Sequence, residues 1–167
     1  YLKAISSKGN YLGPFLHLGL GWSYLRMNKG SQAGIEFDKV DESLLGEKER
    51  RVLFSGKAEV FYSMEEYDKA ISLYYKALDS QEVLLPQSLI DRLRYNLALA
   101  LAKKGRYSDA VIELKKIYLT GADEDIKFQA ILKEGDIYQS IANYPEALKA
   151  YELLLGSKPK NIYDHYA

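Results

Sequence analysis

The sequence has no cysteine among its 167 residues. Disulfide frameworks, thiolate metal sites and cysteine nucleophiles are therefore excluded. The compartment stays open, because a chain without thiols suits an oxidising or a reducing environment. The sequence also has no apolar run near the roughly 18 residues that a membrane-spanning helix needs. Lysine and arginine (23) balance aspartate and glutamate (23), so no net charge attracts nucleic acid or anionic lipid.

Histidine is scarce as well, which leaves few side chains for chemistry. His17 occupies an expected helix-packing position and is interpreted as structural, and no metal-ligand spacing accompanies His165. The carboxylates at Glu65-Glu66 and at 123–125 fall at turns and helix starts, where acidic residues favour the helix dipole and the free N–H groups. No GxxxxGK[ST] phosphate loop is present. We therefore expect no catalytic residue, no metal and no cofactor.

The composition is otherwise that of a soluble globular protein, with 47% hydrophobic and 28% charged residues. Tyrosine is the exception, with 15 copies against 5 phenylalanines and 1 tryptophan. Either the tyrosine ring fills apolar space while its hydroxyl reaches water, or the genome is biased towards tyrosine codons. The second explanation hints at a bacterial source, and neither identifies a function.

An arrangement of small and large apolar residues recurs four times along the chain. The blocks are anchored on four alanines spaced by 37, 40 and 37 residues: Ala33, Ala70, Ala110 and Ala147. Twelve residues before each anchor lies a small residue: Gly21, Ala58, Ala98 and Gly135. Nine residues before it and four after it lie large apolar residues: Tyr24, Phe61, Leu101 and Tyr138, then Phe37, Tyr74, Leu114 and Tyr151. Four blocks in one register indicate a repeat architecture.

Each block predicts two amphipathic helices, because apolar residues three or four apart share one helix face. Short turns separate the helices at 28–31 (NKGS), 64–66 (MEE), 104–106 (KGR) and 142–143 (AN). Gly105 suits the left-handed residue that ends a helix, and Asn28 tolerates that conformation. The small residues permit close approach of two helices, and stacked hairpins bury a continuous core.

The blocks resemble tetratricopeptide repeats, whose pattern has Trp, Leu-Gly and Tyr in the first helix, then Ala, Phe and Ala in the second and a closing Pro. Block four carries Gly135, Tyr138, Tyr144, Ala147, Tyr151 and Pro159. Block three carries Leu97-Ala98, Leu101, Gly105, Tyr107, Ala110 and Leu114. Block two carries Phe54, Ala58, Phe61, Tyr67, Ala70, Tyr74 and Ala77. Block one carries Leu20-Gly21, Tyr24, Ala33 and Phe37, with His17 in place of Trp and Gly30 in place of Tyr.

The resemblance implies an all-α fold, a right-handed α-solenoid of stacked antiparallel helix hairpins. One domain is expected at 14–159, with repeats at about 14–47, 51–84, 91–124 and 128–161. Residues 1–13 are expected to be the end of a preceding repeat and a linker, and 160–167 the start of a further helix. The blocks exceed the family's 34-residue repeat, and the extra length is expected in longer second helices or longer connecting loops.

The resemblance also implies a non-catalytic protein–protein interaction module, which binds a peptide or helical segment in a concave groove lined by the first helices. Carried over position by position, the groove residues are Trp22, Arg26, Glu59, Tyr62, Arg92, Tyr95, Asn96, Lys103 and Asp136. Trp22, if exposed, has the character of a binding anchor; the alternative is that it packs on a preceding repeat. A clamp for carboxylate tails is disfavoured, because only Asn96 and Lys133 match it and Glu59 would repel a carboxylate.

A second function stays open beside the groove. The array would then be a structural spacer or assembly segment of a larger complex, which contacts partners, or a second copy of itself, through end repeats and convex faces. A regulatory domain fused to an enzyme is a third reading. In each case the partner is a protein of unknown identity, with no nucleic acid and no direct membrane insertion expected. Zero net charge also disfavours the RNA-reading pentatricopeptide arrays.

Overall fold

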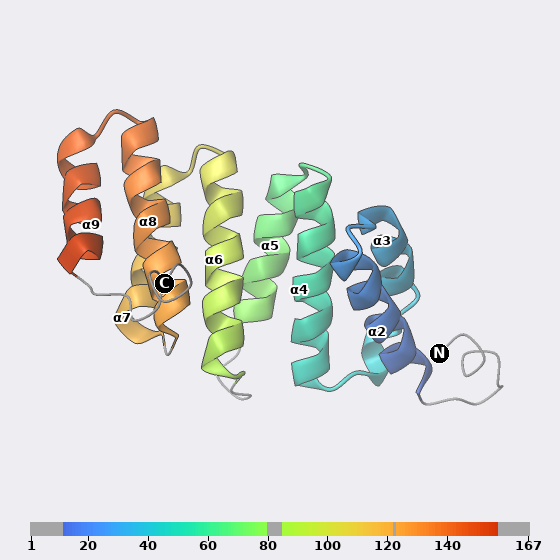
Figure 1. Cartoon of the computed structure of the whole chain (residues 1–167). Helices are drawn as coiled ribbons and strands as arrows, with labels where there is room; N and C mark the ends of the chain where they lie inside the picture. The colour runs from blue at the N-terminus through green and yellow to red at the C-terminus, as the bar shows by residue number, and fades with distance from the viewer. Residues whose placement is uncertain (1–11, 80–84, 122, 157–167) are drawn as a thin grey trace, which may run out of the picture. The chain divides into compact units, whose positions relative to one another are not determined.

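The computed structural model describes residues 12–79, 85–121 and 123–156, which form eight α-helices and one short 3-10 helix, η1. Their bounds are α2 (Gly13–Arg26), α3 (Gly30–Asp38), η1 (Glu42–Leu44), α4 (Glu47–Ser63), α5 (Tyr67–Leu78), α6 (Gln87–Lys103), α7 (Tyr107–Thr120), α8 (Glu124–Ser140) and α9 (Tyr144–Gly156). Consecutive helices pair as four hairpins, α2 with α3, α4 with α5, α6 with α7 and α8 with α9 (Figure 1). The described residues contain no strand. The predicted all-α helical-repeat class is therefore confirmed.

The hairpins belong to two compact units. The first unit runs to Leu85 and holds α2 to α5, and the second begins at Pro86 and holds α6 to α9. Within each unit the second helix of one hairpin packs on the first helix of the next, α3 on α4 and α7 on α8. The segments expected at 1–13 and 160–167 fall almost wholly outside the described residues, as do the ends of the second and fourth repeats.

The extra length of the blocks is accommodated in two different ways. After α3 it forms a connection that contains η1, where Asp41 Oδ1 accepts a hydrogen bond of 3.0 Å from the Ser43 backbone N–H and Leu45 is buried in the core. In the third repeat it lengthens α7 to 14 residues, against 9 in α3. Asp123 then begins α8 directly, with its Oδ1 accepting from the Asp125 N–H at 2.9 Å. The carboxylate cluster at 123–125 therefore caps a helix, as expected.

The core follows the repeat pattern, with one difference in the partners of the small residues. All four anchor alanines are buried. A Cβ placed on Gly21 would overlap the ring of Phe37, four residues after the anchor, and a Cβ on Gly56 of α4 would lie 2.5 Å from the same ring. Gly135 stands in the same relation to Tyr151. From the sequence we expect the glycines to let the two helices of a hairpin approach closely. In the structure, the space that the missing side chains leave is filled by the rings of Phe37 and Tyr151.

The four hairpin turns share one backbone geometry. The residue five before each anchor has a positive φ: Asn28 (56°), Glu65 (62°), Gly105 (74°) and Ala142 (57°). In each turn the next backbone N–H donates a 2.9 Å hydrogen bond to the carbonyl of the large apolar residue nine before the anchor. This is the bond of a Schellman motif, which ends a helix with a left-handed residue. Gly105 is therefore left-handed as predicted, and the other three turns place a residue with a Cβ in that conformation, Asn28, Glu65 and Ala142.

Replacing Ala142 or Glu65 by glycine is expected to raise the free energy of unfolding by about 0.5–1 kcal/mol. The left-handed conformation costs a residue with a Cβ roughly 1–2 kcal/mol, which glycine avoids. The greater conformational freedom of glycine in the unfolded chain offsets part of this stabilisation. Urea titration followed by circular dichroism measures the change. Gly105→Ala is the reverse control and should destabilise by about 1 kcal/mol. A lower midpoint for Ala142→Gly would contradict the argument.

Candidate interaction surface

The first helices of unit 1 carry four of the residues that the sequence assigned to a groove. Trp22 of α2 is half-buried, with its ring 6.1 Å from that of Phe37 at an interplanar angle of 74°. Its indole Nε1 is buried and makes no hydrogen bond to a described residue. Arg26 is exposed at the end of α2. Trp22 therefore contributes to the core of unit 1 and keeps part of its surface accessible, and its role as a binding anchor stays a prediction.

The other two groove residues of unit 1 lie on α4. Tyr62 packs edge-on against Tyr67 of α5, with ring centroids 5.4 Å apart. Glu59 is half-buried one turn earlier on α4. Tyr62 thus packs against the start of α5, next to the hairpin turn, while part of the residue remains accessible. The structure places both residues on the first helix, as the repeat register requires, and α2 and α4 contact each other within the unit.

The first helices of unit 2 carry the remaining five residues. On α6, Arg92 and Lys103 are exposed, while Tyr95 and Asn96 are half-buried. On α8, Asp136 is half-buried and near α9. Because α6 contacts α8, the five side chains belong to two neighbouring helices of one unit.

Asp136 already has two partners. Lys133 Nζ lies 2.9 Å from Asp136 Oδ2, and the Tyr151 hydroxyl donates to Asp136 Oδ1 at 3.2 Å. Burial and the neighbouring Asp136 carboxylate both raise the pKa of Tyr151. The Tyr151 hydroxyl therefore stays protonated at neutral pH and holds α9 to α8. Asp136 serves the packing of this hairpin as well as any surface it presents.

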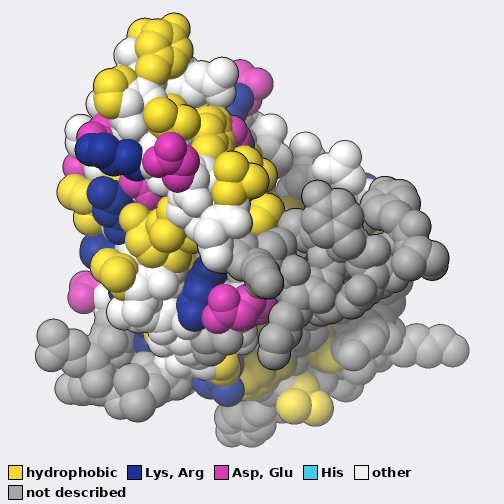
Figure 2. Space-filling model, turned by 60° about the vertical axis from the view of Figure 1, so that its left-hand side comes forward, with side chains coloured by type: hydrophobic (Ala, Val, Ile, Leu, Met, Phe, Trp, Pro, Cys, Tyr) yellow, Lys and Arg dark blue, Asp and Glu magenta, His cyan; other side chains and the backbone are white. Residues whose placement is uncertain are grey.

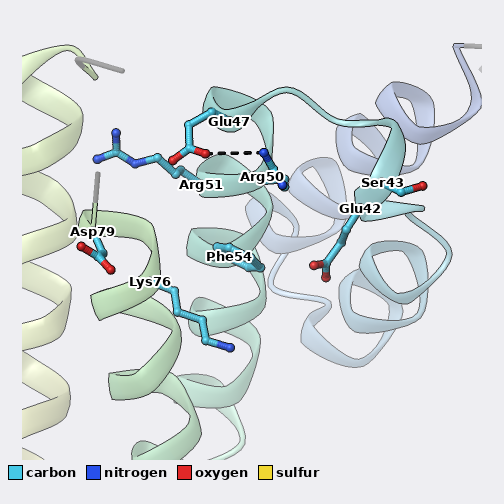
Figure 3. Close-up of a pocket in the computed structure, with 8 residues that line it drawn as sticks. All are labelled: Glu42, Ser43, Glu47, Arg50, Arg51, Phe54, Lys76 and Asp79. Atoms are coloured by element: carbon cyan, nitrogen blue, oxygen red, sulfur yellow. Dashed lines mark hydrogen bonds and ion pairs between the residues drawn. The ribbon is translucent and has the colours of Figure 1, made fainter. Parts of the chain in front are cut away.

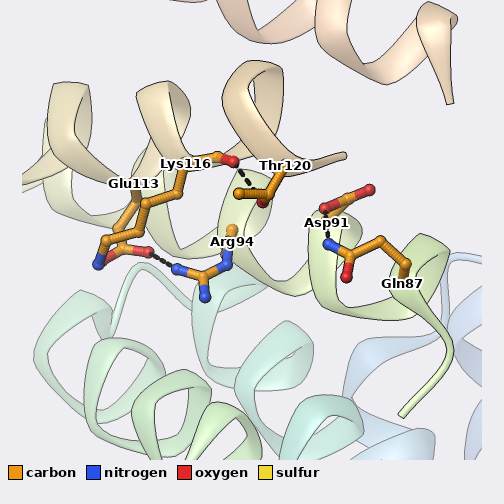
Figure 4. Close-up of polar contacts among 6 residues, drawn as sticks. All are labelled: Gln87, Asp91, Arg94, Glu113, Lys116 and Thr120. Carbon is orange, nitrogen blue, oxygen red and sulfur yellow. Dashed lines mark hydrogen bonds and ion pairs between the residues drawn. The ribbon is translucent and has the colours of Figure 1, made fainter. Parts of the chain in front are cut away.

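Each helix of the third hairpin has a buried carboxylate, and an ion pair joins the two helices (Figure 4). Arg94 Nη1 of α6 donates to Glu113 Oε2 of α7 at 2.9 Å, and Lys116 Nζ donates to the other carboxylate oxygen at 2.6 Å. Glu113 is buried. Gln87 Nε2 donates to the buried Asp91 at 2.7 Å on α6. These carboxylates are neutralised or hydrogen-bonded within the scaffold, which favours a packing role over acid–base chemistry.

The first hairpin has a contact equivalent to the one between Arg94 and Glu113, with a histidine in place of the arginine. His17 Nδ1 of α2 lies 2.7 Å from Glu36 Oε2 of α3, and Lys39 Nζ lies 2.7 Å from Glu36 Oε1. Burial opposes ionisation of Glu36, but the hydrogen bonds and charges of Lys39 and His17 outweigh it and lower the pKa of this carboxyl group. The structural interpretation of His17 agrees with this geometry. In the second repeat, the positions equivalent to His17 and Glu36 hold two apolar residues, Phe54 and Leu73.

A further ionisable cluster lies between α7 and α8. Burial, together with a hydrogen bond to the Glu134 carboxylate, raises the pKa of Tyr118 well above its ordinary value. Lys115 Nζ lies 3.5 Å from Glu134 Oε1. Glu134 is buried, and Lys115 balances its charge across the interface between two consecutive hairpins. This is a contact between hairpins that the apolar repeat pattern does not reveal.

Unit 1 has a cavity of about 400 Å³ between η1, the first turns of α4 and the end of α5 (Figure 3). The residues that line it are Glu42, Ser43, Glu47, Arg50, Arg51, Phe54, Lys76 and Asp79. Three cations face three carboxylates, so the cavity has no net preference for an anion or a cation. Arg51 Nε donates to the Ala77 carbonyl at 2.7 Å, and Lys76 lies 5.9 Å from the centre of the Phe54 ring. Both side chains therefore stabilise the hairpin.

The sequence did not point to this cavity or to the polar pairs. Part of the cavity is built by η1, which lies in the extra length between repeats, where the repeat pattern carries no information. The signal for the polar pairs was present but weak, since Lys39, Lys76 and Lys116 all stand six residues after an anchor alanine. Among the described residues no group of three His, Cys, Asp or Glu side chains could hold a metal ion. Within the same ranges no helix is both long and apolar enough to cross a membrane.

Comparisons with known proteins agree with the architecture. The family model described as "Tetratricopeptide repeat" matches residues 49–118. Among solved structures, the crystal structure of MamA matches with a TM-score of 0.73 and 18% sequence identity, over 93% of this chain and 83% of that one. No curated protein sequence matches the chain. These findings support a module for protein–protein interaction or scaffolding.

Proposed function

We propose that this chain, a tetratricopeptide-repeat protein, binds an acidic segment of a partner protein along its first helices α6 and α8, with no catalysis of its own. The observation that supports the proposal is a row of side chains along one face of α6. Arg92, Asn96 and Lys103 follow one another at i, i+4 and i+11, which places them on the same side of a helix. Arg92 and Lys103 are exposed and pair with no carboxylate among the described residues.

The spacing of the two cations suggests the kind of segment that would fit. At 1.5 Å per residue, Arg92 and Lys103 are separated by roughly 16 Å along the helix axis. In an extended peptide alternate side chains share one face, and four residues span about 13 Å. Two carboxylates four residues apart would therefore lie on one side of the segment, within reach of the long Arg92 and Lys103 side chains, and opposite charges at such a surface favour both association and register.

The neighbouring helix α8 also offers an exposed apolar side chain. Leu132 is an exposed large hydrophobic residue of α8. Lys133 and Asp136 neutralise each other nearby, so they add no strong charge of their own. A partner segment with a leucine or similar side chain between its two carboxylates would use both helices. We expect roughly micromolar affinity, as for transient recognition of a peptide.

Fluorescence anisotropy tests the proposal with a labelled peptide that has glutamates at positions 1 and 5 and a leucine at position 3. The double substitution Arg92→Glu and Lys103→Glu is expected to weaken binding by at least about tenfold, because two attractive contacts become repulsive. The matched control reverses two cations of unit 1 that are exposed and, like Arg92 and Lys103, pair with no carboxylate among the described residues, Lys29→Glu and Lys48→Glu. This control makes the same change in net charge and should leave binding nearly unchanged. Equal loss in both variants, or no binding to the unaltered chain, would refute the α6 site.

A further inference from the structure

The outer face of α9 carries large apolar side chains. Tyr144 is 65% exposed, Leu148 57% and Leu155 86%. The spacing of four and seven residues puts the three side chains in one stripe along the helix. Figure 2 shows the molecule turned so that the side of α9 comes forward, with hydrophobic side chains grouped among charged ones. Exposed stripes of this kind mark interaction sites more often than scattered single residues do.

The corresponding face of α7 shows what such a stripe contacts inside the array. Val111 and Leu148 each stand one residue after an anchor alanine, but Val111 is only 6% exposed. Tyr118 and Leu155 each stand eight residues after the anchor, and Tyr118 packs against the apolar cluster that contains Ile131 of α8. The face is therefore the one on which the first helix of a following hairpin packs.

A charge pair accompanies this interface in both units. Asp38 of α3, five residues after its anchor, lies 3.4 Å from Lys57 of α4. Lys115 of α7, also five after its anchor, lies 3.5 Å from Glu134 of α8. Lys57 and Glu134 each stand thirteen residues before the next anchor, so the two pairs are equivalent and opposite in sign.

On α9 the equivalent position holds Glu152, which is exposed. It lies between Leu148 and Leu155 on the same stripe. By continuity with the two interfaces just described, a helix that packs here should place a cation opposite Glu152. The residue after that cation should be small, as Ala58 follows Lys57 and Gly135 follows Glu134.

We propose that this face of α9 docks an amphipathic helix of a partner protein that has a lysine or arginine opposite Glu152, followed by glycine or alanine. A second copy of the chain does not supply such a helix. Its first helices hold Leu20, Lys57, Leu97 and Glu134 at the required position. Lys57 is already paired with Asp38 and Glu42 in its own unit. The site is separate from the α6 surface proposed above, and neither proposal depends on the other.

The test uses two labelled synthetic peptides that differ in one residue. The first has the sequence of α8, residues Glu124–Ser140, and the second is the same peptide with Glu134→Lys. The lysine peptide should bind the unaltered chain about five- to tenfold more tightly than the glutamate peptide, because one meets Glu152 with an opposite charge and the other with a like charge. On a Glu152→Lys variant the order should reverse. Glu152 is exposed, and the circular dichroism of this variant should match that of the unaltered chain.

Three results would overturn the proposal. The first is equal binding of the two peptides, or binding of neither, to the unaltered chain. The second is a preference that does not change in the Glu152→Lys variant. The third is a concentration-dependent dimer in light scattering that Leu148→Asp abolishes, because this would assign the face to a second copy. Loss of peptide binding in the Leu148→Asp variant, with the chain monomeric throughout, would support the docking site.

Discussion

Arg94→Phe is expected to lower the free energy of unfolding by about 2–3 kcal/mol. The substitution leaves the buried Glu113 carboxylate with Lys116 as its remaining cationic partner among the described residues. Removing one member of a fully buried pair costs roughly 3–5 kcal/mol. The smaller figure applies because Arg94 is partly exposed and Lys116 remains in place. Urea titration at pH 7 followed by circular dichroism measures the loss.

The second repeat supplies the compensating change. Its residues at these two positions are Phe54 and Leu73, so the double variant Arg94→Phe and Glu113→Leu installs a pair that the fold already uses. Most of the lost stability should return, because an apolar pair of suitable size leaves no buried charge. It also removes the Arg94 Nε, which is buried without a hydrogen bond to a described residue. A double variant no more stable than Arg94→Phe alone would show that the repeats do not share this packing geometry.

Gly21→Ala should destabilise unit 1 by about 1–2 kcal/mol. The new methyl group would overlap the Phe37 ring, and forcing an extra carbon into a packed core costs roughly 1–3 kcal/mol. Part of that cost is offset, since alanine is the better helix former by about 1 kcal/mol. The ring cannot simply move away from α2, because Gly56 of α4 lies on it as well. Thermal and urea unfolding measure the change.

Gly19→Ala is the matched control on the same helix. A Cβ at Gly19 meets no atom within 4 Å, so only the gain in helix propensity remains. We expect this variant to be more stable by up to about 1 kcal/mol. Opposite signs for two identical substitutions, two residues apart, would establish that the Phe37 ring needs the absence of a side chain at Gly21. Equal effects would show that glycine acts there only through the backbone.

Much of the scaffold could be predicted from spacing alone. The alanine anchors are buried, the turns fall where glycine and asparagine suggested them, and the hairpins pair in chain order. Spacing works for these features because every repeat makes the same backbone contacts. It does not say which atom fills the room left by a small residue, and for Gly21 that atom belongs to a ring on the neighbouring helix rather than to an alanine.

The candidate site was less predictable for a physical reason. A position in the repeat register places a residue on a helix face, but the size of its neighbours decides its exposure. Trp22 reaches Phe37 and is half-buried, whereas Arg92 and Lys103 extend from α6 into solvent. The charged residues at each hairpin interface also differ from repeat to repeat, so no single motif describes them.

The charge inversion between the two interfaces has a consequence for how such a chain can be rearranged. Hairpins of one array are often regarded as interchangeable modules, yet here they have a fixed order. If α8 followed α3, Glu134 would stand beside Asp38, and if α4 followed α7, Lys57 would stand beside Lys115. Each rearrangement would place two like charges side by side at the seam, one of them on the buried Glu134 or the half-buried Lys57. Recombination of these repeats would therefore need a compensating change of sign at every new junction.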